Sequence, residues 1–146
     1  MADLIAEGNP NLRIVNASFY APGGPIDGEL QHEEHRITET TQYFSISEVV
    51  NQSSKLPNTM PSAEEFTEYM EEMRVPKDAD IIVYDHVGMF AVARVAFMFR
   101  HFGATNVRIM NGGLKKWLKE EKRPVFKGIY DYGEGLPEEG DYSYEV

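Results

Sequence analysis

The segment from residue 80 to residue 102 constrains the fold more than any other part of the chain. Residues 80–84 read Asp-Ile-Ile-Val-Tyr, a continuous apolar run after the first position. Such a run is typical of a strand covered on both faces, as in a parallel sheet. A short loop separates it from residues 89–102, which are apolar enough for a central helix. A strand buried on both faces needs helices on both sides of its sheet, so we expect an α/β domain.

The rest of the chain repeats this alternation of strands and helices. Short runs rich in β-branched and aromatic residues predict three more strands, at residues 12–17, 43–46 and 106–110. Helices are expected at residues 29–35, from 62 onward and at 114–121. The pattern therefore predicts a central, mostly parallel β-sheet with helices on both faces.

The best-defined helix start is the Ser62-Ala-Glu-Glu65 sequence. This is a capping box, in which the Ser62 side chain accepts from the Glu65 N–H and the Glu65 side chain reaches back. Phe66, Met70 and Met73 then recur at helical spacing. We expect these three side chains to pack in the core rather than to form a binding surface.

Length and charge limit the classes of partner. A chain of 146 residues fits one compact domain. Its formal charge of −10 repels phosphate backbones and anionic lipid, so we expect no nucleic-acid partner. No apolar run is as long as a membrane span, so we expect no direct membrane insertion.

Composition divides the chain into three parts: an N-terminal extension at residues 1–11, a domain at 12–127 and an acidic tail at 128–146. The tail holds six acidic residues, no basic residue and several glycines. This composition favours disorder. The alternative is that its tyrosines dock on a partner or back on the domain; they are Tyr130, Tyr132, Tyr142 and Tyr144.

The chain contains no cysteine. This excludes disulfides, thiolate metal sites and every mechanism that needs a sulfur nucleophile within these residues.

Several short motifs, each weak alone, occur in a specific order and spacing. They are Val15-Asn-Ala-Ser-Phe-Tyr-Ala-Pro22, Gln42-Tyr-Phe-Ser-Ile46 with Ser53-Ser-Lys-Leu-Pro57, Val83-Tyr-Asp85 with Ala93-Arg94 and Met98-Phe-Arg-His-Phe-Gly103, and Asn111-Gly-Gly-Leu-Lys-Lys-Trp117 with Arg123-Pro-Val125. Together they resemble the rhodanese-like sulfurtransferases. Within that family the chain is most similar to the non-catalytic N-terminal domain of thiosulfate and 3-mercaptopyruvate sulfurtransferases. The resemblance implies a rhodanese-like fold.

The chain departs from the family pattern at two places. Asn16 stands where members usually carry Asp, which puts a structural hydrogen bond in doubt. Residues 37–41 read Ile-Thr-Glu-Thr-Thr where members carry His-Ile-Pro-Gly-Ala. That change removes a histidine and a turn, so we expect the loop before Tyr43 to follow another path.

The resemblance also implies where the reactive group should be. Active members carry a persulfide-bearing cysteine after the central strand, and the aligned residue here is Asp85. A carboxylate cannot hold sulfane sulfur, so sulfur transfer by the family mechanism is excluded in this chain, as is cysteine-phosphatase chemistry. We interpret Asp85 as a cap for N–H donors at the next helix. The loop that follows is then vestigial; its residues are His86, Val87, Gly88, Met89 and Phe90.

Alternative chemistry at this loop is less favoured. Asp85 and His86 could form an acid/base pair, but adjacent residues leaving a strand point in different directions. No serine, threonine or lysine lies nearby in sequence as a nucleophile. His32 and His35 have a spacing that suits zinc only if further ligands converge, and we expect both to be surface residues. We therefore expect no metal and no cofactor.

Two residues outside the tail are also binding candidates. Arg94 matches an arginine of the N-terminal domains and is expected to make a structural ion pair, with substrate recognition as the alternative. Trp117 is expected to pack in the core or between domains.

We therefore predict a pseudoenzyme: a catalytically inactive domain that serves as a protein-binding or structural subunit of a larger assembly. The contact surfaces would be residues 87–90 and the tail. The alternative is the non-catalytic half of a two-domain sulfurtransferase whose cysteine-bearing half is elsewhere, and a small-molecule sensor is the weakest option. A small-molecule substrate is not expected. The resemblance favours a mitochondrial location over a cytoplasmic one.

Overall fold

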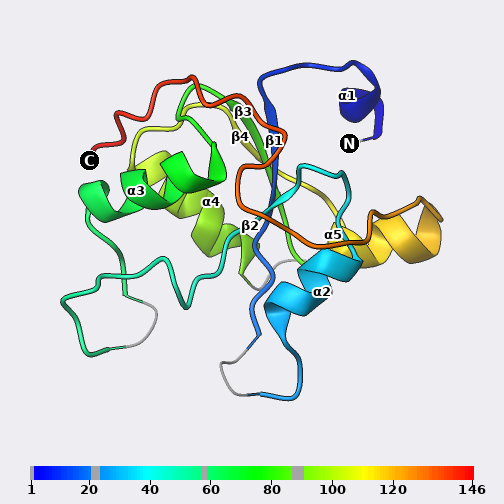
Figure 1. The fold of residues 1–146 in the computed structure, drawn as a ribbon, viewed down its shortest axis with the longest axis horizontal. Coiled ribbons are helices and arrows are strands. Elements are labelled where there is room, and N and C mark those ends of the chain that lie inside the picture. The colour runs from blue at the N-terminus through cyan, green and yellow to red at the C-terminus, as the bar shows by residue number, and fades with distance from the viewer. Residues whose placement is uncertain (1, 21–23, 57–58, 87–90) are drawn as a thin grey trace.

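The computed structural model describes residues 2–20, 24–56, 59–86 and 91–146. Its centre is a four-stranded parallel sheet in the order β2-β1-β3-β4. The strands are β1 (Leu12–Asn16), β2 (Gln42–Tyr43), β3 (Asp80–Tyr84) and β4 (Val107–Ile109). The ladder between β1 and β3 runs over five residue pairs from Leu12↔Asp80 to Asn16↔Tyr84. Because the strands are parallel, their carboxyl ends share one edge, at the bottom of Figure 1.

Helices cover both faces of the sheet. They are α1 (Ala2–Ala6), α2 (Gly28–Glu34), α3 (Ala63–Met73), α4 (Val92–His101) and α5 (Gly113–Lys115), which continues as the π-helical turn η1 (Lys116–Glu120). In Figure 1, α3 and α4 lie on the left of the sheet and α5 on the right. The predicted α/β class with helices on both faces is confirmed. None of the helices in the described ranges is long and apolar enough to cross a membrane.

Two hydrophobic cores follow from this layering. The larger one joins α3 and α4 to the sheet face that carries Val15, Ile81 and Val83. The smaller one packs Leu114 and Trp117 on the other face of the sheet. Side chains alternate between the faces of a strand, so neighbouring residues of β3 feed different cores. This is why the continuous apolar run of β3 is needed.

Local signals set the bounds of α3 as predicted. The Glu65 N–H donates to Ser62 Oγ at 3.1 Å, and the Ser62 N–H donates to Glu65 Oε1 at 3.0 Å. Phe66, Met70 and Met73 are buried, which confirms the expected core face. The helix ends at Arg74, whose φ of 56° is left-handed.

Two elements differ from expectation. The strand expected at residues 43–46 is limited to Gln42–Tyr43. In the described part of the expected helix at 89–102, Phe97 keeps 54% of its surface exposed. That helix is therefore buried on one side rather than all round.

The tail is the largest difference from expectation. Composition favours disorder for residues 128–146, but the structure docks this segment along the domain, as the orange-to-red path in Figure 1 shows. Its main chain is held at both ends, because Gly128 N–H donates to Glu33 O at 3.1 Å and Glu145 N–H donates to Phe102 O at 2.9 Å. Composition could not reveal acceptors that other segments provide.

Candidate functional site

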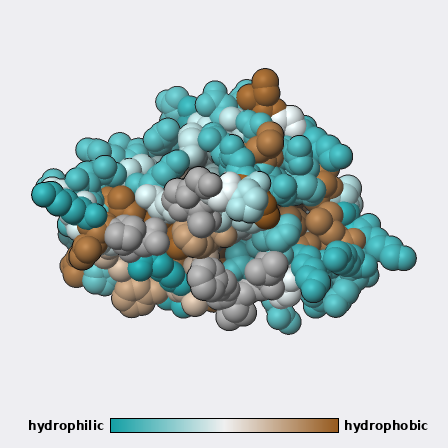
Figure 2. Space-filling view, turned by 90° about the horizontal axis from the view of Figure 1, so that it is seen from below, coloured by the Kyte–Doolittle hydropathy of each residue, from teal (hydrophilic) through white to brown (hydrophobic). Residues whose placement is uncertain are grey.

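The candidate site lies where β1 and β3 end. The Ala17 N–H donates to Tyr84 O at 2.7 Å and keeps the two chains side by side beyond the ladder. Asp85 and His86 follow β3 at this edge, and Phe19 and Tyr20 follow β1. Figure 2 views the molecule from this side and shows brown side chains scattered among teal ones.

Asp85 is a buried residue, with 2% of its surface exposed. Its Oδ2 accepts a hydrogen bond from the Ala91 N–H at 3.2 Å, at the start of α4. Its carbonyl accepts from the Leu114 N–H at 2.9 Å, in the first turn of α5. Asp85 therefore links the end of β3 to two helix N-termini. The contact with Ala91 is of the kind that the capping interpretation predicts, because it joins the carboxylate to an N–H donor at the start of α4.

The two aromatic neighbours of Asp85 are uncharged near neutral pH. Tyr20 and His86 meet edge to face, with ring centroids 6.2 Å apart. Burial raises the pKa of Tyr20, and the Asp85 carboxylate raises it further. Burial lowers the pKa of His86, with added repulsion from His35 and Lys119 against the attraction of Asp85. Of the predicted vestigial loop only His86 is described; residues 87–90 lie outside the described ranges.

A hydrogen-bonded network behind this edge involves the residue that departs from the family pattern. Asn16 Oδ1 accepts from Ser18 N–H at 3.0 Å and from Ser18 Oγ at 2.6 Å. Asn16 Nδ2 lies 3.0 Å from His32 Nδ1, and His32 Nε2 lies 2.9 Å from Thr41 O. The contacts assign a neutral ring with its proton on Nε2, because the amide must donate and the carbonyl must accept. The Asn16 side chain thus makes three hydrogen bonds within this network.

The expectation that His32 is a surface residue is wrong. Only 1% of its surface is exposed, and its ring stacks on Tyr43 and meets Tyr130 edge to face. Burial lowers the pKa of His32 to about 3, and the Arg36 charge adds to this against the Thr41 hydrogen bond. Sequence placed His32 in a polar loop and could not show that the tail covers it.

Metal binding by the two histidines of this region finds no support in their contacts. Both ring nitrogens of His32 are engaged, and His35 Nδ1 lies 3.2 Å from Gln31 O. Within the described residues, no three His, Asp or Glu side chains converge in a way that could hold a metal ion.

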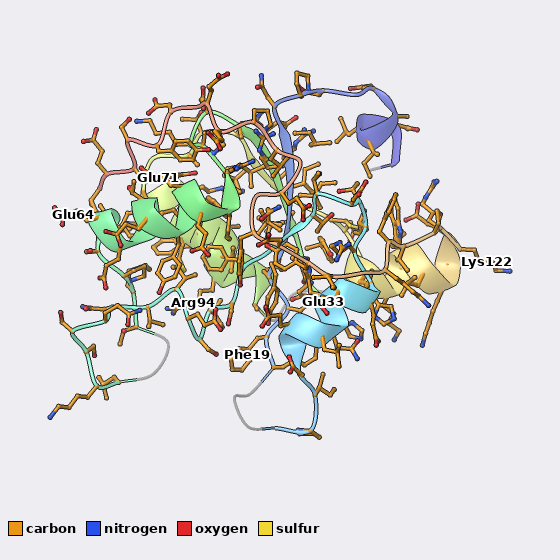
Figure 3. All side chains as sticks on the ribbon, viewed as in Figure 1. Phe19, Glu33, Glu64, Glu71, Arg94 and Lys122 are labelled. Atoms are coloured by element: carbon orange, nitrogen blue, oxygen red, sulfur yellow. The ribbon has the colours of Figure 1, made fainter. Side chains whose placement is uncertain are left out.

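The structure separates the other binding candidates. Trp117 packs in the smaller core with 4% exposure, and its Nε1 donates to Pro124 O at 2.9 Å. Arg94 is half-buried in the first turns of α4, and Figure 3 places it near the same edge as Phe19. The ion pair expected for Arg94 stays a prediction.

The four tail tyrosines lie against the domain itself. Tyr130 Oη donates to Gln42 Oε1 at 2.9 Å and accepts from Tyr43 N–H at 3.0 Å. Tyr144 Oη donates to Val75 O at 2.7 Å. Tyr132 and Tyr142 are only partly buried. Sequence reasoning missed Gln42, the buried acceptor that also receives the Gly133 N–H at 3.0 Å. The only feature of the sequence that could have indicated Gln42 is that a polar residue directly precedes the strand expected at residues 43–46.

Comparison with known proteins places this geometry in a family. The family model described as "Rhodanese-like domain" matches residues 30–120 of this chain. Thiosulfate sulfurtransferase of Cricetulus griseus is 34% identical over 124 residues, which are 82% of this chain and 41% of that protein.

Two solved structures extend the comparison. The 3-mercaptopyruvate sulfotransferase SseA of Escherichia coli gives a TM-score of 0.78 at 29% identity, covering 89% of this chain and 50% of that one. The sulfur transferase subunit of yeast mitochondrial complex I gives 0.69 at 26% identity, covering 89% and 47%. The chain spans about half or less of each of these relatives. It belongs to the family of rhodanese-like domains.

Proposed function

We propose that this chain is a catalytically inactive rhodanese-like domain that acts as a protein-binding or structural subunit of a larger assembly. The observation that carries the proposal is the buried Asp85, which takes the place of the family's nucleophile in a chain without cysteine. Sulfur transfer needs a thiolate that attacks sulfur and later releases it. A carboxylate has no sulfur atom for that step.

The contacts of Asp85 support a structural role in place of a catalytic one. Its carboxylate receives the Ala91 N–H, and its main chain receives the Leu114 N–H. A carboxylate at a helix N-terminus is favoured by the helix dipole as well as by the hydrogen bond. The family scaffold is kept while the donors that would serve a bound anion are used internally.

A subunit role has support from one relative. The yeast protein compared above is a sub-stoichiometric sulfur transferase subunit of mitochondrial complex I. By this likeness we propose a protein partner and a mitochondrial location, with the cytoplasm as the alternative. The charge of −10 supports a protein partner over nucleic acid.

Native extraction tests the subunit role. The chain is isolated under gentle conditions, and its mass is measured by light scattering on a sizing column. We expect a complex with a partner in fixed stoichiometry. A solitary monomer at every salt concentration would contradict the proposal.

A second function has its own support. The chain matches only 41% of thiosulfate sulfurtransferase, so it could be the non-catalytic half of an enzyme whose cysteine-bearing half is a separate polypeptide or lies beyond these residues. The co-purifying partner would then be a cysteine-bearing sulfurtransferase domain. Its turnover should fall when this chain is removed, whereas an unrelated partner would favour the first function.

A further inference from the structure

A groove of about 530 Å³ opens beside the candidate site, between the start of α2 and the segment after β2. Besides two serines, the side chains of its walls are two tyrosines, three carboxylates and one isoleucine: Tyr20, Tyr43, Asp27, Glu29, Glu48 and Ile26. Tyr20 also meets the ring of His86, so the groove is continuous with the edge where Asp85 lies. Its volume is in the range of ordinary binding pockets.

The groove carries negative charge. Glu29 and Glu48 are exposed, and none of the described residues lining it is a lysine or an arginine. Asp27 Oδ1 is already used, because it accepts from the N–H groups of Glu29 and Leu30 at the start of α2. The two glutamates are therefore the carboxylates available to a ligand.

The hydroxyl of Tyr43 lies close enough to this charge to be affected by it. Burial raises its pKa to about 12, and Glu48 and Asp27 contribute in the same direction against a hydrogen bond from Ser45. The three carboxylates disfavour anions, including thiosulfate and 3-mercaptopyruvate, after which relatives of this chain are named. They favour a cation.

The walls also favour one kind of cation. A planar guanidinium pairs with carboxylates through two parallel N–H groups and stacks on tyrosine rings. Ile26, with 46% of its surface exposed, offers apolar contact for the methylene stem of such a side chain. Tyr20 is the ring available for such stacking, because it is only half-buried, whereas Tyr43 is buried and stacked on His32. A compact ammonium would use the charge but not the Tyr20 ring as well.

We propose that this groove binds an arginine-bearing basic segment of a partner protein. The groove thus deepens the proposed function, on which this assignment rests, by naming the class of partner. Electrostatic complementarity of this kind contributes to specificity and to the association rate. A chain with a formal charge of −10 attracts basic partners in general, and the groove provides the place where one is recognised.

The test uses the full chain and a fluorescent Gly-Arg-Gly-Arg-Gly peptide. The control peptide carries citrulline in place of both arginines, which keeps the side-chain shape without the charge. The double variant Glu29→Gln/Glu48→Gln removes two of the three negative charges of the groove and leaves Asp27 in place to cap α2. Its control, Glu68→Gln/Glu139→Gln, removes two exposed carboxylates that do not line the groove. We expect the groove variant to bind the arginine peptide about tenfold more weakly, from two charge pairs. The control should change binding less than twofold, and the citrulline peptide should bind to neither.

Four outcomes would overturn the assignment. Equal weakening of peptide binding in both variants would show only a general charge effect. Equal binding of the citrulline and arginine peptides would show that the groove does not recognise the guanidinium group. Spermine that binds the groove more tightly than the peptide, with the same loss in the groove variant, would point to a small polyamine. A stoichiometric protein complex that survives Glu29→Gln/Glu48→Gln would leave the subunit role standing while this groove assignment fails.

Discussion

At the scale of the residue, the proposed loss of sulfur chemistry depends on Asp85. The position after β3 requires a group that suits N–H donors at a helix start, and both a thiolate and a carboxylate satisfy that requirement. Only the thiolate is also a sulfur nucleophile. The contact from Ala91 N–H to Asp85 Oδ2 is therefore the residue-level basis of the inactive state that we propose.

Substitution of Asp85 tests this capping role. Asp85→Ala should lower the free energy of unfolding by about 1 kcal/mol, as loss of a helix cap does. Asp85→Asn keeps an oxygen acceptor and should lose less than about half of that. Urea denaturation at pH 7 measures both. An alanine variant as stable as the parent chain would show that the buried carboxylate contributes no capping free energy.

His32 is the second residue whose environment sets its chemistry. Its folded pKa of about 3 lies below the ordinary value of 6.5, because the ring is buried between Tyr43 and Tyr130. The unfolded chain thus binds a proton in a pH range where the folded chain does not. Stability from this group is complete above pH 6.5 and is lost as the pH falls towards 3.

The expected pH effect is measurable. From pH 7 to pH 5, His32 should cost about 2 kcal/mol of unfolding free energy. His32→Gln should remove this part of the pH dependence, while His35→Gln should keep it. Urea denaturation across this pH range gives the slopes. If the free energy of unfolding fell with pH equally in the parent chain and in His32→Gln, the neutral buried ring would be contradicted.

At the scale of elements, the tail acts as a strap over the sheet edge formed by β2. Tyr130 closes this edge by accepting the Tyr43 N–H, a main-chain donor that an edge strand would otherwise leave open. Tyr144 forms the second attachment, with its ring edge-on to Phe66 at 5.0 Å and its hydroxyl on Val75 O. The strap also covers His32, so the two features depend on each other.

Paired tyrosine variants test the strap. Tyr130→Phe leaves the buried Tyr43 N–H without its acceptor and should lower the unfolding free energy by about 2 kcal/mol. Tyr142 is the matched control, because its buried hydroxyl has no hydrogen-bond partner within the part of the chain that the structure describes. Tyr142→Phe should change stability by less than about 0.5 kcal/mol. Equal effects would mean that the strap is held by its rings alone.

The sequence predicted those elements whose signals are local. β3 and the start of α3 were found because a buried strand and a capping box show themselves within a few residues. The tail and His32 were not, because their partners lie far away along the chain; Tyr130 and Gln42 are 88 residues apart. The identity of Asp85 was readable, but its contact with Ala91 depended on the path of the loop between them.

At the scale of the whole molecule, acidic side chains outnumber basic ones, 24 against 14, and the formal charge is −10. Figure 3 shows Glu64 and Glu71 on the outer side of α3 at one end and Lys122 beyond η1 at the other. The acidic strap runs towards the α3 end. The domain thus carries an excess of negative charge around a site that we propose to be silent, which suits a subunit that docks on a basic partner.

The most direct test of the central claim is a sulfur-transfer assay on the purified chain. Thiocyanate is measured with thiosulfate and cyanide as substrates, and bovine thiosulfate sulfurtransferase serves as the positive control. With Asp85 in the nucleophile position, we expect no thiocyanate above the rate without protein. Turnover that follows the chain through purification would contradict the account.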